Sequence, residues 1–164
     1  MTPALPVVKR TARAILLDEA AAHQGRPPDM LVIKRSKPGL PPYWITPGGG
    51  VEAGDPTVLD ALHREVLEEL GAKVTDVVPA FVDTVPEGAH GLKVQHFFVC
   101  RLTSMDPALR HGPEIDAPCG TYEIVRLPFT PAGLTAVDLV PGTLSDYLTR
   151  NIPGVLSLLA PDLG

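Results

Sequence analysis

The chain contains 164 residues, 45% hydrophobic and 20% charged, which is the composition of a globular protein long enough to bury one substantial core. Its formal net charge of −5 argues against a general polyanion-binding surface, so we expect no nucleic-acid partner. No apolar stretch approaches the ~20 residues that span a bilayer, and the first residues lack a signal-peptide pattern, so we expect a cytoplasmic protein without a membrane partner.

Short strands are predicted in the first third of the chain. Residues 11–17 and 30–34 are β-branched and apolar enough to be strands, and a Gly/Pro-rich loop at residues 24–29 joins them. A third strand at residues 43–46 leads directly into three glycines. Trp44, just before these glycines, is interpreted as a core residue or as a base-stacking side chain.

The main helix is predicted over residues 57–70. Asp55 and Pro56 suit a helix start, because Asp can cap the first turn and Pro fits its geometry. Gly71 is expected to end the helix. Glu65 and Glu69 border its apolar stripe and should be partly desolvated, whereas Glu68 should be more open.

The second half of the chain adds strands at residues 74–82, 94–102 and 121–127, and a helix from residue 143 to about 151, before Pro153. Mixed strands with helices on two faces predict an α/β protein, an α/β/α sandwich, as one domain over residues 1–164. Cys100 and Cys119 have no metal or redox spacing and are expected to be reduced, partly buried thiols.

Three carboxylates gather on the predicted main helix. Glu65, Glu68 and Glu69 lie at i, i+3 and i+4, so they project from one side and repel one another by ~0.2–0.5 kcal/mol per close pair. A hard divalent cation with oxygen ligands would remove this cost. The pattern therefore predicts a metal site.

This stretch resembles the Nudix box, whose second half is Arg-Glu-apolar-x-Glu-Glu-x-Gly-apolar. Residues 64–72 match that half at every position. The first half departs: counted from Gly50, Pro56 stands in place of the first Glu, and counted from Gly49, Asp55 takes that place with one extra residue before Arg64. We interpret Asp55 as mainly a helix cap.

The resemblance to Nudix (MutT-like) hydrolases implies an α/β/α sandwich with a mixed central sheet and a loop-helix-loop metal site. It also implies that Glu68 and Glu69 are the principal Mg²⁺ ligands, that Glu65 is a ligand or an orienting group, and that Mn²⁺ can substitute. Arg64 would hold a carboxylate, with Asp60 and Glu68 one helical turn to either side.

Other candidates surround the box. Gly48, Gly49 and Gly50 would let backbone groups reach metal or phosphate. Glu114, in a loop bounded by glycine and proline, resembles the downstream general-base or metal-binding glutamate of many Nudix enzymes, with a loop acid of no role as the alternative. Arg35 and Lys37 could reach a substrate phosphate, with a solvated strand end as the alternative. Glu52 lies where many members of the resembled family also have an acid, with a solvated loop side chain as the alternative, and His63 and Glu123 are expected to face solvent.

The leading functional hypothesis is Mg²⁺-dependent hydrolysis of a diphosphate linkage in a small nucleoside-diphosphate-X substrate, with water attacking phosphorus. A non-catalytic nucleotide sensor is the alternative, supported by the altered first half of the box. An isopentenyl diphosphate isomerase ranks below both, because the box has the hydrolytic form. Members of this fold often pair, so a homodimer is also considered.

Overall fold

The computed structural model describes residues 5–111 and 121–160. Its centre is a curled, mixed sheet of eight strands, in the order β5-β6-β1-β2-β3-β8, with β4 paired to β1 and β7 paired to β2. The β1–β6 and β3–β8 pairs are parallel and the other pairs are antiparallel. The strands are β1 (Val7–Asp18), β2 (Asp29–Ser36), β3 (Tyr43–Ile45), β4 (Gly48–Gly50), β5 (Ala72–Glu87), β6 (Gly91–Met105), β7 (Thr121–Pro128) and β8 (Leu139–Val140).

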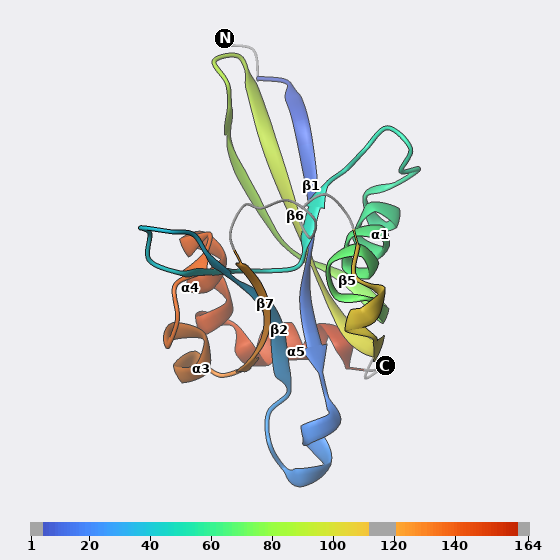
Figure 1. The fold of residues 1–164 in the computed structure, drawn as a ribbon, viewed down its shortest axis with the longest axis vertical. Helices are drawn as coiled ribbons and strands as arrows, with labels where there is room; N and C mark the ends of the chain where they lie inside the picture. Colours follow the sequence, from blue (N-terminus) through green and yellow to red (C-terminus); the bar gives the residue numbers. More distant parts are fainter. Residues whose placement is uncertain (1–4, 112–120, 161–164) are drawn as a thin grey trace.

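Helices cover both faces of this sheet, with α1 on one side and α3 and α4 on the other (Figure 1). This arrangement confirms the predicted α/β class and the two helical layers. The helical segments are η1 (Ala20–Gln24), α1 (Val58–Leu70), η2 (Pro107–Leu109), α3 (Pro131–Thr135), α4 (Gly142–Arg150) and α5 (Ile152–Leu159). No helix within the described residues is long and apolar enough to cross a membrane.

Two hydrophobic cores form because successive side chains of β1 point to opposite faces of the sheet. Ala14 and Leu16 pack with the apolar stripe of α1. Ile15 and Leu17 pack with Phe97 and the helices near the C-terminus.

The main helix begins at Val58, and its N-cap is Thr57, whose hydroxyl accepts a hydrogen bond from the Asp60 amide. The prediction that Asp55 caps this helix is therefore wrong. Thr57 satisfies the exposed amides of the first turn equally well. The predicted end is confirmed, because Gly71 is left-handed (φ 63°) and its amide bonds to the carbonyls of Val66 and Leu67.

Near the C-terminus the predicted helix corresponds to α4, but the sequence reasoning missed α5. Pro153 was expected only to stop a helix, yet here it lies in the first turn of α5, directly after Asn151. Proline is compatible with that turn, because its missing N–H would have no helical partner there. The strands β1, β5 and β6 are also longer than predicted, and β5 and β6 form a long hairpin at the top of the molecule (Figure 1).

Candidate metal and diphosphate site

The acids of α1 have the exposures that their positions predicted. Glu65 and Glu69 retain 4% and 3% of their surface, whereas the Glu68 side chain retains 19%. The two buried acids flank the stripe formed by Leu62, Val66 and neighbouring apolar residues, so packing of the helix against β1 draws them under the glycine loop. Buried carboxylates are costly unless paired or bound to a metal, so their partners define the site.

Arg64 is the cation at the centre of these acids. Its Nε and Nη2 each lie 2.9 Å from one oxygen of Asp55, a two-bond ion pair. Its Nη1 lies 3.0 Å from Glu65 Oε1 and 3.4 Å from both oxygens of Glu68. The role of Arg64 in holding a carboxylate stays a prediction, and its contacts include Asp55 and Glu65 as well as the expected Glu68.

Asp60 lies one helical turn before Arg64, as expected, but its carboxylate bonds to the start of the helix. There it accepts a hydrogen bond of 2.7 Å from the Thr57 hydroxyl. Glu52 contacts Arg64 only at 3.8 Å, and 69% of its side chain is exposed, so it is a solvated loop acid.

The contacts of Asp55 define its role, which the altered first half of the box left open. Besides its pair with Arg64, it accepts a hydrogen bond of 2.8 Å from the Glu52 amide. The Arg64 hydrogen bonds, followed by that amide, lower the pKa of Asp55 to about 2. The same pairing with Asp55, together with Glu65, raises the pKa of Arg64. Asp55 is thus an ionised partner of the box arginine, despite its shorter side chain and shifted spacing.

The glycine loop approaches the acids through its backbone. The Gly48 amide donates to Glu69 Oε1 at 3.3 Å. Gly48 has φ 147°, and a Cβ there would lie 2.2 Å from the Ala12 carbonyl oxygen, so only glycine fits. A Cβ on Gly49 would lie 2.6 Å from the Glu65 carboxylate. Gly49 therefore leaves room for the Glu65 carboxylate, whereas Gly48 allows the loop to approach the backbone of β1 closely.

Gly50 differs from its two neighbours, because a Cβ at that position would meet nothing within 4 Å. Its contribution is a carbonyl oxygen, which accepts a hydrogen bond of 3.0 Å from Arg64 Nη2. This contact ties the end of the glycine loop to the helix.

The residues present fit a hard divalent cation. Asp55, Glu65 and Glu68 contact Arg64, and Glu69 accepts a hydrogen bond from the Gly48 amide, so four carboxylates gather where the glycine loop meets α1. Within residues 5–111 and 121–160, no group of three or more His, Cys, Asp or Glu side chains is gathered closely enough to hold a metal ion. Mg²⁺ keeps several waters and takes few carboxylates together with substrate phosphate oxygens, so one or two of these acids would be enough to hold it.

Three further sequence candidates lie on β2, on β3 and in the loop between these strands. Arg35 stacks over the Tyr122 ring, 4.1 Å from its centroid, and alternation along β2 places it on the same face as Ile33, which packs in the core beneath α1. Trp44 packs against the opposite core, as its buried interpretation predicted. Lys37 lies 5.9 Å from the centroid of the Tyr43 ring.

His63 and Glu123 are exposed, as expected, and Cys100 is a buried free thiol whose pKa burial raises to about 12. Glu114 and Cys119 lie outside the described residues. The predictions for those two side chains therefore stay predictions.

A pocket that the sequence reasoning missed opens beside the glycine loop. It has a volume of about 210 Å³, and its lining consists of Arg13, Ile45, Gln95, Val140 and Pro141. Arg13 pairs with Gly48 in the β1–β4 register and donates a hydrogen bond of 3.0 Å to the Thr46 carbonyl. The sequence signal for this pocket was two polar residues, Arg13 and Gln95, in otherwise apolar strands. Only the strand register brings these two residues together.

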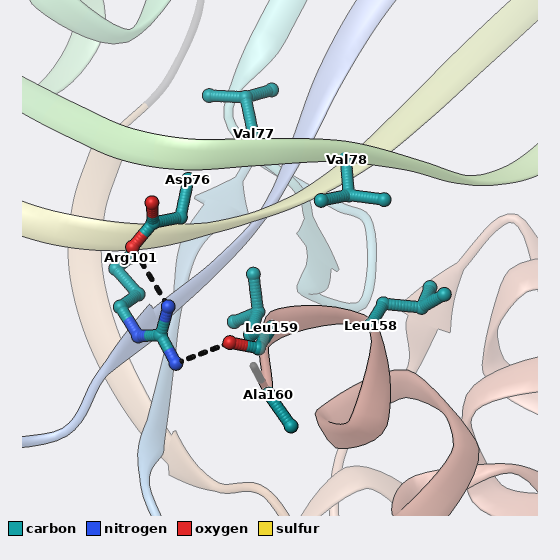
Figure 2. A pocket seen from close by; sticks show the side chains of 7 residues that line it. All are labelled: Asp76, Val77, Val78, Arg101, Leu158, Leu159 and Ala160. Carbon is teal, nitrogen blue, oxygen red and sulfur yellow. Dashed lines mark hydrogen bonds and ion pairs between the residues drawn. The ribbon is translucent and has the colours of Figure 1, made fainter. Parts of the chain in front are cut away.

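A larger pocket, about 460 Å³, lies between β5 and the end of α5 (Figure 2). Arg101 crosses it with its donors engaged, at 3.1 Å from Glu19, 2.7 Å from Asp76 and 2.7 Å from the Leu159 carbonyl. These contacts attach the C-terminal helix to the sheet. We therefore assign this pocket a structural role and not a catalytic one.

The comparisons with known proteins agree with this geometry. The sequence model of the NUDIX domain family matches residues 8–132, so the chain belongs to that family. The prediction of a Nudix hydrolase is confirmed at this level, and residues 8–132 include the glycine loop, α1 and the whole acid cluster. Among curated protein sequences, none matches the chain.

Solved structures share the fold at low sequence identity. A NUDIX hydrolase from Nitrosomonas europaea has a TM-score of 0.65 and 16% identity, covering 94% of this chain and 97% of its own. The E. coli ORF135 protein has a TM-score of 0.60 and 20% identity, covering 98% and 100%. The NUDIX domain of Shewanella oneidensis NrtR, solved in complex with ADP ribose, has a TM-score of 0.60 and 15% identity, covering 92% and 90%.

Proposed function

We propose that this protein is a Mg²⁺-dependent hydrolase of a diphosphate linkage in a small nucleoside-diphosphate-X compound. The observation that carries the proposal is the pair of buried acids, Glu65 and Glu69, beneath a glycine loop whose Gly48 amide donates a hydrogen bond to Glu69. Family membership supports the same reaction class. In this proposal Glu65, Glu68 and Glu69 hold the metal, and Mn²⁺ can replace Mg²⁺.

When bound, the metal would polarise a phosphoryl oxygen and lower the pKa of a bound water. The chain's own groups do the rest. Arg64 keeps Glu65 and Glu68 in position while Asp55 holds Arg64 from the other side. The glycine loop provides close backbone approach to the phosphates, and Arg35 contributes a positive charge at the same face of the sheet.

Water attacks one phosphorus atom of the diphosphate, the bridging P–O bond breaks, and the second phosphate group leaves with the bridging oxygen. A glutamate accepts the proton of the attacking water. The candidates for this base are the box glutamates and Glu114.

The sensor alternative depended on the altered first half of the box. Because Asp55 still pairs with the box arginine, that departure provides little support for a loss of activity. The remaining predictions are a single domain over residues 1–164, a homodimer and a cytoplasmic location. Each of them stays a prediction.

A screen of hydrolysis over nucleoside triphosphates, ADP-ribose, dinucleoside polyphosphates and NADH, with Mg²⁺, with Mn²⁺ and with EDTA, tests the proposal. We expect metal-dependent turnover of at least one compound, with a phosphate-containing product that takes up ¹⁸O from labelled water. Tight nucleotide binding without turnover of any compound would favour the sensor instead.

A further inference from the structure

The pocket beside the glycine loop contains an amide whose orientation is fixed by its neighbour. Gln95 on β6 lies directly opposite Asp83 on β5 in the antiparallel register. Its Nε2 donates a hydrogen bond of 3.2 Å to Asp83 Oδ2, and the other oxygen of Asp83 accepts one of 3.1 Å from the Thr143 hydroxyl. Gln95 is 8% exposed and lines the pocket, so its amide is a buried polar group at a ligand-sized opening.

A carboxylate only accepts hydrogen bonds, so Asp83 requires the NH₂ end of the Gln95 amide to face it. A flipped amide would bring its carbonyl oxygen against Asp83 and lose the hydrogen bond. Since Asp83 is the partner of this amide among the described residues, its carbonyl oxygen and one N–H are left for a ligand, in a fixed order. Most amides can flip to suit the partner that they meet, but this one cannot.

The pocket also has the size and place for one end of a nucleotide. At about 210 Å³ it is smaller than a whole-ligand site, and Ile45, Val140 and Pro141 give it apolar walls. Arg13 on its rim pairs with Gly48, whose amide contacts Glu69. A planar base in this pocket would thus direct an attached diphosphate along the glycine loop to the acids.

We propose that Gln95, held by Asp83, selects a nucleobase with an amino group next to an unprotonated ring nitrogen, as in cytosine or adenine. The carbonyl oxygen of Gln95 accepts from the amino group and its free N–H donates to the ring nitrogen, the bidentate pattern that amides make with adenine. Uracil and hypoxanthine lack this amino group: each has a carbonyl oxygen in its place, which would face the carbonyl oxygen of Gln95, and the adjacent N–H of the six-membered ring reverses the order of donor and acceptor. Gln95 is the specificity residue and Asp83 is its positioning residue. This inference rests on the proposed function.

The test is equilibrium binding of two matched pairs, CMP with UMP and AMP with IMP, to the metal-free protein in EDTA. We expect the amino member of the tighter pair to bind at least about tenfold more tightly. Asp83→Asn, which can offer either a donor or an acceptor, should reduce that ratio to threefold or less. Asp76→Asn, the same change on the same strand in the Arg101 cluster, should leave the ratio unchanged.

Gln95→Leu provides a second test, since it removes both hydrogen-bonding groups while keeping similar bulk. It should lower the affinity for the amino member to that of the oxo member. Equal binding within both pairs, a preference for the oxo member, an unchanged ratio in both Asp83→Asn and Gln95→Leu, or no binding of any of the four would overturn the inference. Because binding is measured without metal, this result is independent of the hydrolysis screen.

Discussion

Arg64 and Asp55 join the helix to the loop before it through two parallel hydrogen bonds of 2.9 Å. The side chain of Asp55 is 8% exposed and that of Arg64 is 25% exposed. The pair is therefore largely shielded from water. Its two hydrogen bonds fix the plane of the Arg64 guanidinium, which also contacts Glu65 and Glu68.

This pair predicts how stability depends on pH. The pKa of Asp55 is lowered to about 2, below the ~3.9 of an unfolded Asp. A depressed carboxyl pKa contributes stability that is fully present above pH ~4 and is lost as the pH falls through about 2. Asp55→Asn should have a lower melting temperature than wild type at pH 6, and the difference should shrink as the pH approaches 2.

Melting curves of both proteins between pH 6 and pH 2 measure this difference. Asp55→Asn should also lower kcat by about tenfold, because Arg64 then loses one of its two bonds to Asp55. A pH-independent difference in melting temperature would mean that Asp55 stabilises the loop by some route other than its ionised contact.

The burial of Glu65 and Glu69 could be predicted because it follows from helical periodicity, and so could the end of α1 at Gly71. The role of Asp55 could not, since Asp55 and Thr57 are both good caps by local rules. Arg64, nine residues after Asp55, pairs with it once the loop folds back, and Thr57 is left as the cap. The Asp83–Gln95 pair likewise depends on strand register, which the sequence does not state.

The glycine loop offers a matched pair of substitutions. Gly49→Ala should displace the Glu65 carboxylate, because the added methyl would lie 2.6 Å from it, whereas Gly50→Ala adds a methyl to open space. We expect kcat to fall at least tenfold further in Gly49→Ala than in Gly50→Ala, since small misplacements of reacting groups are costly. Steady-state kinetics with a Mg²⁺ titration check this, and equal losses would show that Gly49 provides no special clearance.

Glu114 is tested by Glu114→Gln. If this residue is the general base or a late metal ligand, kcat should fall by ~10²–10⁴-fold, the range that general-base catalysis contributes. The melting temperature should change little, because the substitution keeps the size of the side chain. A near wild-type kcat would assign the proton transfer to one of the box glutamates.

Arg101 should matter for stability and not for catalysis. Its contacts with Asp76 and the Leu159 carbonyl attach the end of α5 to the sheet (Figure 2), and Glu19 adds a third contact. Arg101→Met keeps most of the apolar stem and should lower the melting temperature by a few degrees with kcat within twofold of wild type. A large loss of kcat without a change in melting temperature would instead point to a functional role for that pocket.

The most direct measurement is the rate of hydrolysis of the best substrate by wild type, Glu69→Gln and Glu52→Gln, with Mg²⁺ and with EDTA. Gln at position 69 can still accept the Gly48 hydrogen bond, so the fold should persist while the charge is lost. We predict turnover only with Mg²⁺, a loss of ~10²-fold or more in Glu69→Gln, and near wild-type rates in the exposed Glu52→Gln. Turnover in EDTA, or an unchanged kcat in Glu69→Gln, would contradict a carboxylate-held metal at this site.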